Sequence, residues 1–200
     1  MDGSANGNDT SLNNTLTQFI KTYKNALTPD QCQTLIAHFE SKESHWSPII
    51  LNDGSTDVKL DIKRVKQVRL SPEKESDKEA DGILFDSIGT ILQQYLESVN
   101  GHYPNAVRDS GYNLMKYEPN TDFCDWHTDA TSGAIGNRVA AVVWYLNTIS
   151  EGGATEFEWG KKIQPKAGTA IIYPANWLYV HRAVAPVSSP KYVATTWMIY

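Results

Sequence analysis

The second half of the chain is a series of short β-rich segments, and this pattern limits the fold more than any other feature of the sequence. The segments cover 111–118, 138–147, 154–159, 168–173, 180–187 and 192–200. Turn-forming stretches such as Pro119-Asn120, Glu151-Gly152-Gly153 and Ser188-Ser189-Pro190 separate them, since these residue types readily adopt the backbone angles of tight turns. Evenly spaced short strands with no helix between them are typical of a β-sandwich or a jelly roll.

The first half of the chain predicts two helices. The stretch Thr28-Pro29-Asp30-Gln31 has the residues of a capping box with a proline in the first turn, so we expect a helix from there to about Ser41. A second helix is expected around 84–99, where apolar residues recur on one side and Gly101 is placed to end it.

Between the two helices, residues 52–81 carry seven Lys or Arg and eight Asp or Glu. Within this segment Val58, Leu60 and Ile62 alternate with charged residues, which predicts a strand with one face in water. The segment has two interpretations: a solvated edge and loop, or a mobile flap over a pocket.

The length and composition predict one domain. With 200 residues and 40% apolar content, the chain can bury a single core, and no interior stretch has the composition of a linker. We expect a flexible polar tail at 1–15 and one domain at 16–200, with a helical part at about 16–101 and a β-rich core at about 102–200. The net charge of −5 disfavours broad binding to nucleic-acid phosphates.

The sequence does not show the signals of an exported or membrane protein. The first residues have neither the positive charge nor the apolar run of a signal peptide, and no apolar stretch is long enough to cross a bilayer. The two cysteines, Cys32 and Cys124, do not have the spacing of a disulfide framework. We therefore expect a cytoplasmic protein.

The strongest chemical signal is the triplet His127-Thr128-Asp129. One residue separates its two potential ligands, so on a strand His127 and Asp129 point to the same side. His181 follows later in the chain, and Lys191 comes ten residues after it. Two imidazoles and one carboxylate form a facial triad that leaves positions open on iron, unlike a closed four-ligand zinc site. The triplet alone is a weak signal, but its order with His181 and Lys191 favours a metal site.

Several motifs of the second half follow one another in an order that is found in a known family. They are Tyr117-Glu118-Pro119-Asn120, Trp126-His127-Thr128-Asp129, Arg138 leading to Trp144-Tyr145-Leu146-Asn147, Gly152-Gly153-Ala154-Thr155-Glu156-Phe157, Pro165-Lys166-Ala167-Gly168, His181 through Pro186-Val187, and Lys191-Tyr192 before Thr196-Trp197. With these motifs the stretch from Tyr112 to Trp197 resembles the iron- and 2-oxoglutarate-dependent dioxygenases, and within them the prolyl hydroxylase branch. The resemblance implies an α+β fold, a double-stranded β-helix (jelly roll) with the N-terminal helices packed on one sheet. Lys191 matches the collagen-type and small microbial prolyl hydroxylases, which points to a small microbial or viral enzyme.

The resemblance assigns the metal-binding and catalytic roles to His127, Asp129 and His181, which would hold a ferrous ion. Lys191 would then pair with the far carboxylate of 2-oxoglutarate. The formal charges agree with this: the ion and Asp129 together carry one positive charge, the dicarboxylate brings two negative charges, and the Lys191 ammonium group restores neutrality. A neutral set of charges costs much less to bury than an unpaired charge.

Four further residues are implied to hold the co-substrate. The Tyr145 hydroxyl would help Lys191 to bind the far carboxylate, while Tyr117, Thr195 and Trp197 would line the same pocket. Each aromatic residue has an alternative interpretation as an ordinary core residue, and Lys191 has one as a solvated side chain after a turn.

The resemblance implies the activity of a procollagen-proline 4-dioxygenase-like enzyme. Such an enzyme would hydroxylate prolyl residues in a peptide or protein and decarboxylate 2-oxoglutarate to succinate and CO2. Its cofactors would be Fe(II), 2-oxoglutarate and O2, with ascorbate as an optional addition. The expected partner is a proline-containing peptide or protein, not a membrane or a nucleic acid. We expect a monomer or weak dimer in the cytoplasm, which would be the host cytoplasm for a viral protein.

Two alternatives stay open. The first is the same oxygenase chemistry on a free amino acid, another side chain or an alkylated base. The second is a metal-binding jelly roll without oxygenase activity, such as a cupin-like isomerase. Lys191 with Tyr145 favours an oxygenase, because a site that never binds a dicarboxylate has no need of that pair. The candidates for gripping a peptide, which also have an interpretation as solvated surface residues, are Arg64, Arg69, Arg138 and Trp177.

Overall fold

The structure is a computed structural model, in which residues 10–51, 54–99, 107–131 and 133–200 are described. Its helices are α1 (Thr10–Thr17), α2 (Pro29–Glu40) and α3 (Lys78–Ser98), with short 3-10 helices η1 (Glu75–Asp77) and η2 (Gly133–Ile135). Across these described ranges, none of the helices is both long enough and apolar enough to cross a membrane.

The larger sheet has the strand order β1-β13-β10-β15-β8-β6-β2, and β7 also pairs with β15. Its strands are β1 (Lys21–Tyr23), β2 (His45–Trp46), β6 (Lys66–Arg69), β7 (Arg108–Asp109), β8 (Asn113–Tyr117), β10 (Arg138–Tyr145), β13 (Thr169–Pro174) and β15 (Lys191–Ile199). Neighbouring strands are antiparallel.

The smaller sheet has the antiparallel order β12-β11-β14-β9-β5. Its strands are β5 (Lys63–Arg64), β9 (Phe123–His127), β11 (Thr155–Phe157), β12 (Lys162–Ile163) and β14 (His181–Ala183). A separate hairpin consists of β3 (Ile49–Ile50) and β4 (Thr56–Asp57).

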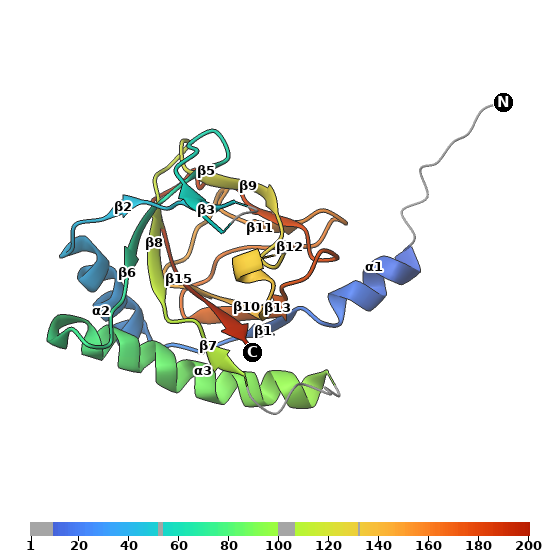
Figure 1. The fold of residues 1–200 in the computed structure, drawn as a ribbon, viewed down its shortest axis with the longest axis horizontal. Coiled ribbons are helices and arrows are strands. Elements are labelled where there is room, and N and C mark those ends of the chain that lie inside the picture. Colours follow the sequence, from blue (N-terminus) through green and yellow to red (C-terminus); the bar gives the residue numbers. More distant parts are fainter. Residues whose placement is uncertain (1–9, 52–53, 100–106, 132) are drawn as a thin grey trace.

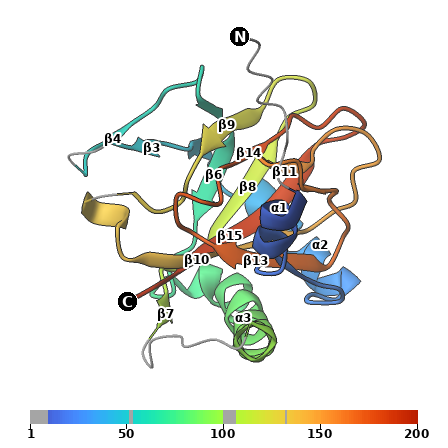
Figure 2. The same ribbon diagram turned by 90° about the vertical axis from the view of Figure 1, so that its right-hand side faces the viewer.

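The two sheets face one another, and the helices α2 and α3 cover the outer face of the larger sheet (Figure 1). Figure 2 shows α3 end-on beneath this sheet, with β9 and β14 of the smaller sheet on the opposite side. The α+β jelly roll with N-terminal helices on one sheet, expected from the sequence, is therefore confirmed.

Strand β10 shows how alternating side chains create two separate cores. Trp144 points to the helical layer, where its indole Nε1 donates a hydrogen bond of 2.9 Å to Ser87 Oγ on α3. Its neighbour Tyr145 points the other way, into the space between the sheets. Because successive side chains of a strand lie on opposite faces, one strand can hold the helices with one face and line a pocket with the other.

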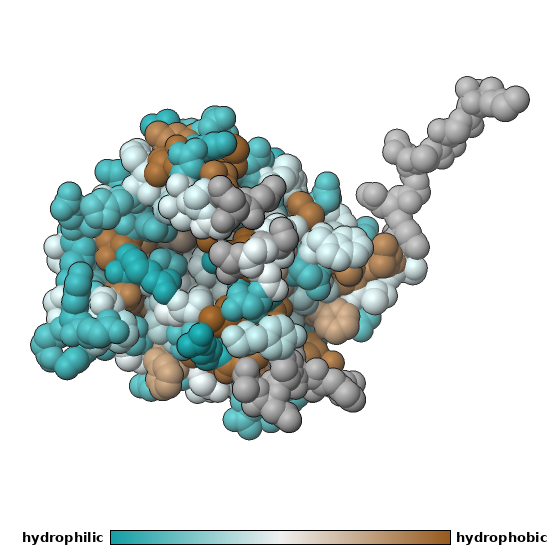
Figure 3. Space-filling view, in the orientation of Figure 1, coloured by the Kyte–Doolittle hydropathy of each residue, from teal (hydrophilic) through white to brown (hydrophobic). Residues whose placement is uncertain are grey.

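Helix α2 begins where the sequence predicts. Thr28 Oγ1 accepts a hydrogen bond from the Gln31 amide at 3.2 Å, and Gln31 Oε1 accepts one from the Thr28 amide at 2.8 Å, so the capping box is formed. The helix buries Cys32, Leu35 and Phe39 against the sheet. Figure 3 shows hydrophilic residues gathered over α2 and the start of α3, as expected for amphipathic helices.

The sequence analysis expected a helical part before about residue 101 and a β-rich core after it, but both sheets contain strands from both parts. The N-terminal part supplies β1, β2, β5 and β6, which pair with other strands of both sheets, so it is not only helical. Residues 1–9 of the expected tail and Gly101, the expected end of α3, lie outside the described residues, while α1 occupies part of the tail region.

The prediction of a strand from the alternation at 58–62 is wrong. The chain turns there, with the amides of Ile62 and Lys63 both donating to the Lys59 carbonyl at 3.1 and 2.8 Å. The strands lie on either side of this turn, as β4 before it and β5 after it. The turn brings the start of β5 next to β9, where Lys63 pairs with Cys124.

Candidate active site

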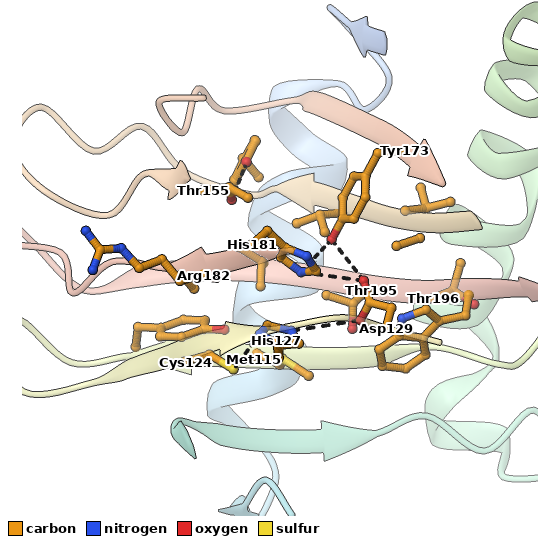
Figure 4. A pocket seen from close by; sticks show the side chains of 18 of the residues that line it. Met115, Cys124, His127, Asp129, Thr155, Tyr173, His181, Arg182, Thr195 and Thr196 are labelled. Carbon is orange, nitrogen blue, oxygen red and sulfur yellow. Dashed lines mark hydrogen bonds and ion pairs between the residues drawn. The ribbon is translucent and has the colours of Figure 1, made fainter. Parts of the chain in front are cut away.

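The predicted metal ligands lie together between the two sheets. His127 ends β9 and His181 begins β14, and the two residues are direct partners in the antiparallel pairing of these strands. Their ring centroids are 4.2 Å apart. Asp129 follows just after β9, and one ligand atom from each of the three residues lies within 4.8 Å of the others. The strand predicted for the triplet therefore ends at His127, but both side chains still reach the same centre (Figure 4).

Backbone carbonyls orient both imidazole rings. His127 Nδ1 donates to the Asp125 carbonyl at 2.7 Å, and His181 Nδ1 donates to the Tyr179 carbonyl at 2.9 Å. With the proton on Nδ1, the Nε2 of a neutral imidazole has a lone pair for a cation. Burial lowers the pKa of His127, but Cys124 and Asp129 more than offset this and raise it to about 9, so a metal ion would have to displace a proton from His127 Nε2. Each Nε2 faces the Asp129 carboxylate, at 3.9 Å for His127 and 3.5 Å for His181.

The charge states of Asp129 and His181 suit ligands. Burial lowers the pKa of His181 to about 4, and the neighbouring His127 contributes to this, so the imidazole is neutral near pH 7. Burial raises the pKa of the Asp129 carboxyl, but His181 and His127 more than offset this and hold it below its usual value. A carboxylate and a neutral imidazole are the forms that bind metal ions.

Tyr173 of β13 is a site residue that the sequence reasoning missed. Its hydroxyl lies 3.2 Å from Asp129 Oδ2 and 3.0 Å from His181 Nε2 (Figure 4). The alternation of β13 could have found it, because Ile171 and Tyr173 face the space between the sheets whereas Ala170 and Ile172 face the helices. What the sequence did not show is that this face of β13 meets the loop carrying Asp129.

Lys191, the first residue of β15, is buried in the same pocket with only 2% of its surface exposed. Its Nζ donates to the Gly153 carbonyl at 3.0 Å and lies 4.1 Å from the centroid of the Tyr117 ring. Among the described residues, no carboxylate forms an ion pair with it. Burial lowers the pKa of Lys191 to about 7. A buried cation with neutral partners is costly, and an anionic ligand would remove that cost.

The remaining predicted residues line this pocket as well, on strands of the larger sheet. Tyr117, Tyr145, Thr195 and Trp197 all contribute to its wall. The Tyr145 hydroxyl forms its hydrogen bond with Thr155 Oγ1, at 2.8 Å, and not with the ammonium group of Lys191. Thr195 Oγ1 is buried without a hydrogen-bond partner, so it is free to bind a polar ligand.

The four residues considered for gripping a peptide are not all in one place. Arg69 and Arg138 line a second groove that opens from the pocket. Arg64 instead pairs with Asp122, with 3.4 Å between Nε and Oδ1. Trp177 is 73% exposed and lines neither cavity.

Comparison with known proteins supports the chemistry that this geometry suggests. Residues 112–199 match the model of the 2OG-Fe(II) oxygenase superfamily. The resemblance to this class, inferred from the motifs between Tyr112 and Trp197, is therefore confirmed.

Within that class the similarity is to prolyl hydroxylases. The chain is 32% identical over 90 residues to prolyl 4-hydroxylase subunit alpha-2 of Gallus gallus and 31% identical over 93 residues to subunit alpha-1 of Homo sapiens. These matches cover 41% and 42% of this chain but only 17% of each relative.

Solved structures of prolyl hydroxylases share the fold. The viral collagen prolyl hydroxylase of Paramecium Bursaria Chlorella virus-1, in its 2OG complex, aligns with a TM-score of 0.67 at 19% identity, over 90% of this chain and 95% of that one. A Pseudomonas putida prolyl-4-hydroxylase aligns with a TM-score of 0.66 at 16% identity, over 94% of this chain and 97% of that one.

Proposed function

We propose that the protein is an Fe(II)- and 2-oxoglutarate-dependent dioxygenase that hydroxylates prolyl residues in a peptide or protein and converts 2-oxoglutarate to succinate and CO2. The observation that carries this proposal is the position of Lys191. Its buried ammonium group shares one pocket with the His127, Asp129 and His181 cluster. A metal-binding jelly roll without an anionic co-substrate has no use for a cation there.

The cluster fits a ferrous ion. Two imidazole nitrogens and one carboxylate oxygen form the 2-His-1-carboxylate set that is typical of non-haem iron oxygenases and that leaves positions for other ligands. When bound, the iron supplies the redox chemistry between dioxygen and 2-oxoglutarate.

The residues of the chain position the co-substrate and exclude water. In this proposal Lys191 binds the far carboxylate, and the unpartnered Thr195 hydroxyl offers a hydrogen bond beside it. Met115, Ala141 and Val193 form apolar parts of the wall, which keep the ion pair in a medium of low polarity. Electrostatic attraction is stronger in such a medium than in water.

The prolyl substrate is supported by the relatives. Prolyl 4-hydroxylases are the proteins matched in sequence, and one neighbour by fold is a Trichoplax adhaerens prolyl hydroxylase in complex with a hypoxia inducible factor peptide fragment, with a TM-score of 0.66 at 14% identity over 96% of this chain and 88% of that one. The groove beside the pocket, of about 300 Å³, offers room for a peptide next to the metal site. Ascorbate stays an expectation that depends on the resemblance alone.

The test is to incubate the protein with Fe(II), 2-oxoglutarate and proline-rich peptides. We expect succinate to form together with peptides that are heavier by one oxygen atom on proline, detected by mass spectrometry. His127→Ala and Asp129→Ala should each abolish both products, because each removes a metal ligand. His45→Ala, on the exposed side of β2, is the matched control and should keep them.

Undiminished succinate formation by the His127 and Asp129 variants would contradict the metal site. A wild-type protein that oxidises a free amino acid or an alkylated base, and no prolyl peptide, would contradict the substrate class.

A further inference from the structure

A second groove continues from the co-substrate pocket to the surface. The two cavities share Lys63, His127, Asp129 and Trp197, so the groove opens directly over the metal-ligand cluster. One wall is apolar, and its residues come from β3, the turn before β5 and η2: Ile49, Ile50, Ile62 and Ile135.

Three cations also line the groove: Lys63 from β5, Arg69 from β6 and Arg138 from β10. Each is held by a neutral backbone carbonyl. Lys63 Nζ donates to Pro48 O at 3.4 Å, Arg138 Nη1 donates to Asp129 O at 3.1 Å, and Arg69 Nη2 donates to Ser110 O. Within the described parts of the chain, none of the three forms an ion pair with a carboxylate.

The positive charges are close enough to affect one another. After burial itself, Arg138 is among the groups that lower the pKa of Lys63, and Arg69 is among those that lower the pKa of Arg138. Cys124 and then Asp129 attract Lys63, and Asp129 also attracts Arg138, but a bound metal ion would use that carboxylate. Asp109 and Asp81 attract Arg69, but neither lines the groove. Asp125 is then the one remaining acidic residue among the described lining residues.

We propose that this groove selects peptides in which an Asp or Glu stands next to the target proline, an inference that depends on the proposed function. Lys63 lines both cavities, so its ammonium group is placed to bind a carboxylate beside the residue that enters the metal site. Arg138 has its guanidinium carbon 3.7 Å from the Trp197 ring centroid, which fixes a second positive group nearby. The net charge of −5 makes this local positive charge stand out from the rest of the chain.

The occupant that fits is a peptide and not a nucleic acid. The apolar wall formed by Ile49, Ile50, Ile62 and Ile135 suits amino-acid side chains, whereas a phosphodiester chain would leave that wall uncovered. The overall negative charge also repels a long polyanion. A short peptide segment with one carboxylate close to proline could pack its side chains against the apolar wall and form an ion pair with the cations of the groove.

The test uses three peptides that differ only in the residue next to proline, which is Glu, Gln or Lys. For the wild-type protein we expect kcat/KM for proline oxidation to be about tenfold or more higher with Glu than with Gln, since a hydrogen bond to a charged group contributes at least that much. The Lys peptide should be the poorest substrate. Mass spectrometry of the oxidised peptides gives the rates.

Two variants assign the preference to Lys63. Lys63→Gln should make the Glu and Gln peptides equal, and Lys63→Glu should invert the order so that the Lys peptide is preferred. Lys66→Gln is the matched control, because Lys66 is exposed on β6, lies with its Nζ 5.4 Å from the Trp46 ring centroid and does not line the groove. It should keep the wild-type preference.

Calorimetric binding of the same peptides separates the inference from the proposed function. Equal affinity of the wild-type protein for the Glu and Gln peptides overturns the inference, even where both are oxidised. Tighter binding of the Glu peptide without any proline oxidation keeps the charge selection and overturns prolyl hydroxylation. Oxidation of an oligonucleotide in place of every peptide overturns both.

Discussion

Lys191 has an unusual environment for a lysine. It is buried, its polar contact is the neutral Gly153 carbonyl, and burial lowers its pKa to about 7. Above that pH the ligand-free side chain has lost its proton. A bound dicarboxylate favours the charged form, so binding must then restore the proton.

This gives a prediction for pH dependence. As pH rises above about 7, the affinity for 2-oxoglutarate should fall, and each molecule bound should take up protons. Calorimetry in buffers of different ionisation enthalpy measures that uptake. Lys191→Met should abolish it and raise the 2-oxoglutarate requirement by about 100-fold, since breaking a buried charge pair is costly. Iron binding should be retained. The same proton uptake in the variant would contradict the assignment of the ammonium group.

The free energy of unfolding of the ligand-free protein also depends on the pKa of Lys191, but it changes with pH in the opposite direction to the affinity for 2-oxoglutarate. Between about pH 7 and the usual pKa of lysine near 10.4, the unfolded chain holds a proton that the folded Lys191 has lost. The contribution of Lys191 to the free energy of unfolding therefore rises with pH across this window.

At the scale of single residues, the sequence predicted the candidate metal ligands and the candidate lysine from their residue types and their order along the chain. Only a few kinds of side chain bind metals and dicarboxylates, so the sequence could group His127, Asp129, His181 and Lys191 as one candidate site. The structure places all four in one pocket. The role proposed for Lys63 was not predicted from the sequence, because the alternation at 58–62 predicted a strand with its charged residues in water. In the structure a turn there directs Lys63 into the groove.

Among the structural elements, the turn before β13 depends on Gly168. Its φ of +73° is a left-handed conformation, and a Cβ added there would lie 2.4 Å from the Leu27 carbonyl oxygen. The Gly168 amide donates to the Tyr145 carbonyl at 2.9 Å, so this turn fixes the end of β10 where the pocket begins.

Replacing this glycine should therefore be costly. Gly168→Ala is expected to lower the free energy of unfolding by at least about 1–2 kcal/mol from the backbone conformation, with the contact to Leu27 adding to it. Gly82→Ala, within α3 with nothing within 4 Å of the added Cβ, is the matched control and should raise stability by about 0.5–1 kcal/mol. Urea denaturation measures both. Equal effects of the two substitutions would contradict the special role of the turn.

The elements that the sequence predicted best are those with local signals. Helix α2 begins at its capping box because Thr28 and Gln31 are close in sequence and bond to each other's backbone. Only the end of strand β9, at the His127 triplet, was expected to be a strand, because Phe123–His127 has no regular alternation of buried and exposed side chains. Its pairing with β14 determines its conformation.

On the scale of the whole molecule, the two halves of the chain share their sheets. β1 pairs with β13, β6 pairs with β8 and β5 pairs with β9, so strands before residue 70 complete both layers. We therefore propose a single folding unit over residues 16–200, within which the expected boundary near 101 separates no independent parts.

A fragment tests this proposal. Residues 107–200 alone would leave β8, β9 and β13 each with only one of its two strand partners and would expose the apolar face that α2 and α3 cover. We expect this fragment to show no cooperative thermal transition and to aggregate, whereas the whole chain unfolds cooperatively. Circular dichroism and light scattering measure the two outcomes. A monomeric fragment with a sharp transition would show that the β-rich half is a domain by itself.

The number and spacing of the strands predicted a β-sandwich or a jelly roll, and the family resemblance implied the jelly roll, but the order of the strands could not be predicted. That order depends on contacts between residues far apart in sequence, such as the pairing of Lys21 with Ile172. Short strand segments do not encode their partners locally, so nothing within either segment identifies the other.

The pairing of His127 with His181 has a consequence for metal selectivity. Main-chain hydrogen bonds of the two strands and the Asp125 and Tyr179 carbonyls hold both rings, so the donor geometry is present before any ion arrives. Such a rigid nitrogen and oxygen set binds cobalt, nickel and zinc more tightly than ferrous iron. For the proposed oxygenase, loading with iron must then depend on which ions the cell supplies, and binding of another metal ion in its place would abolish the activity.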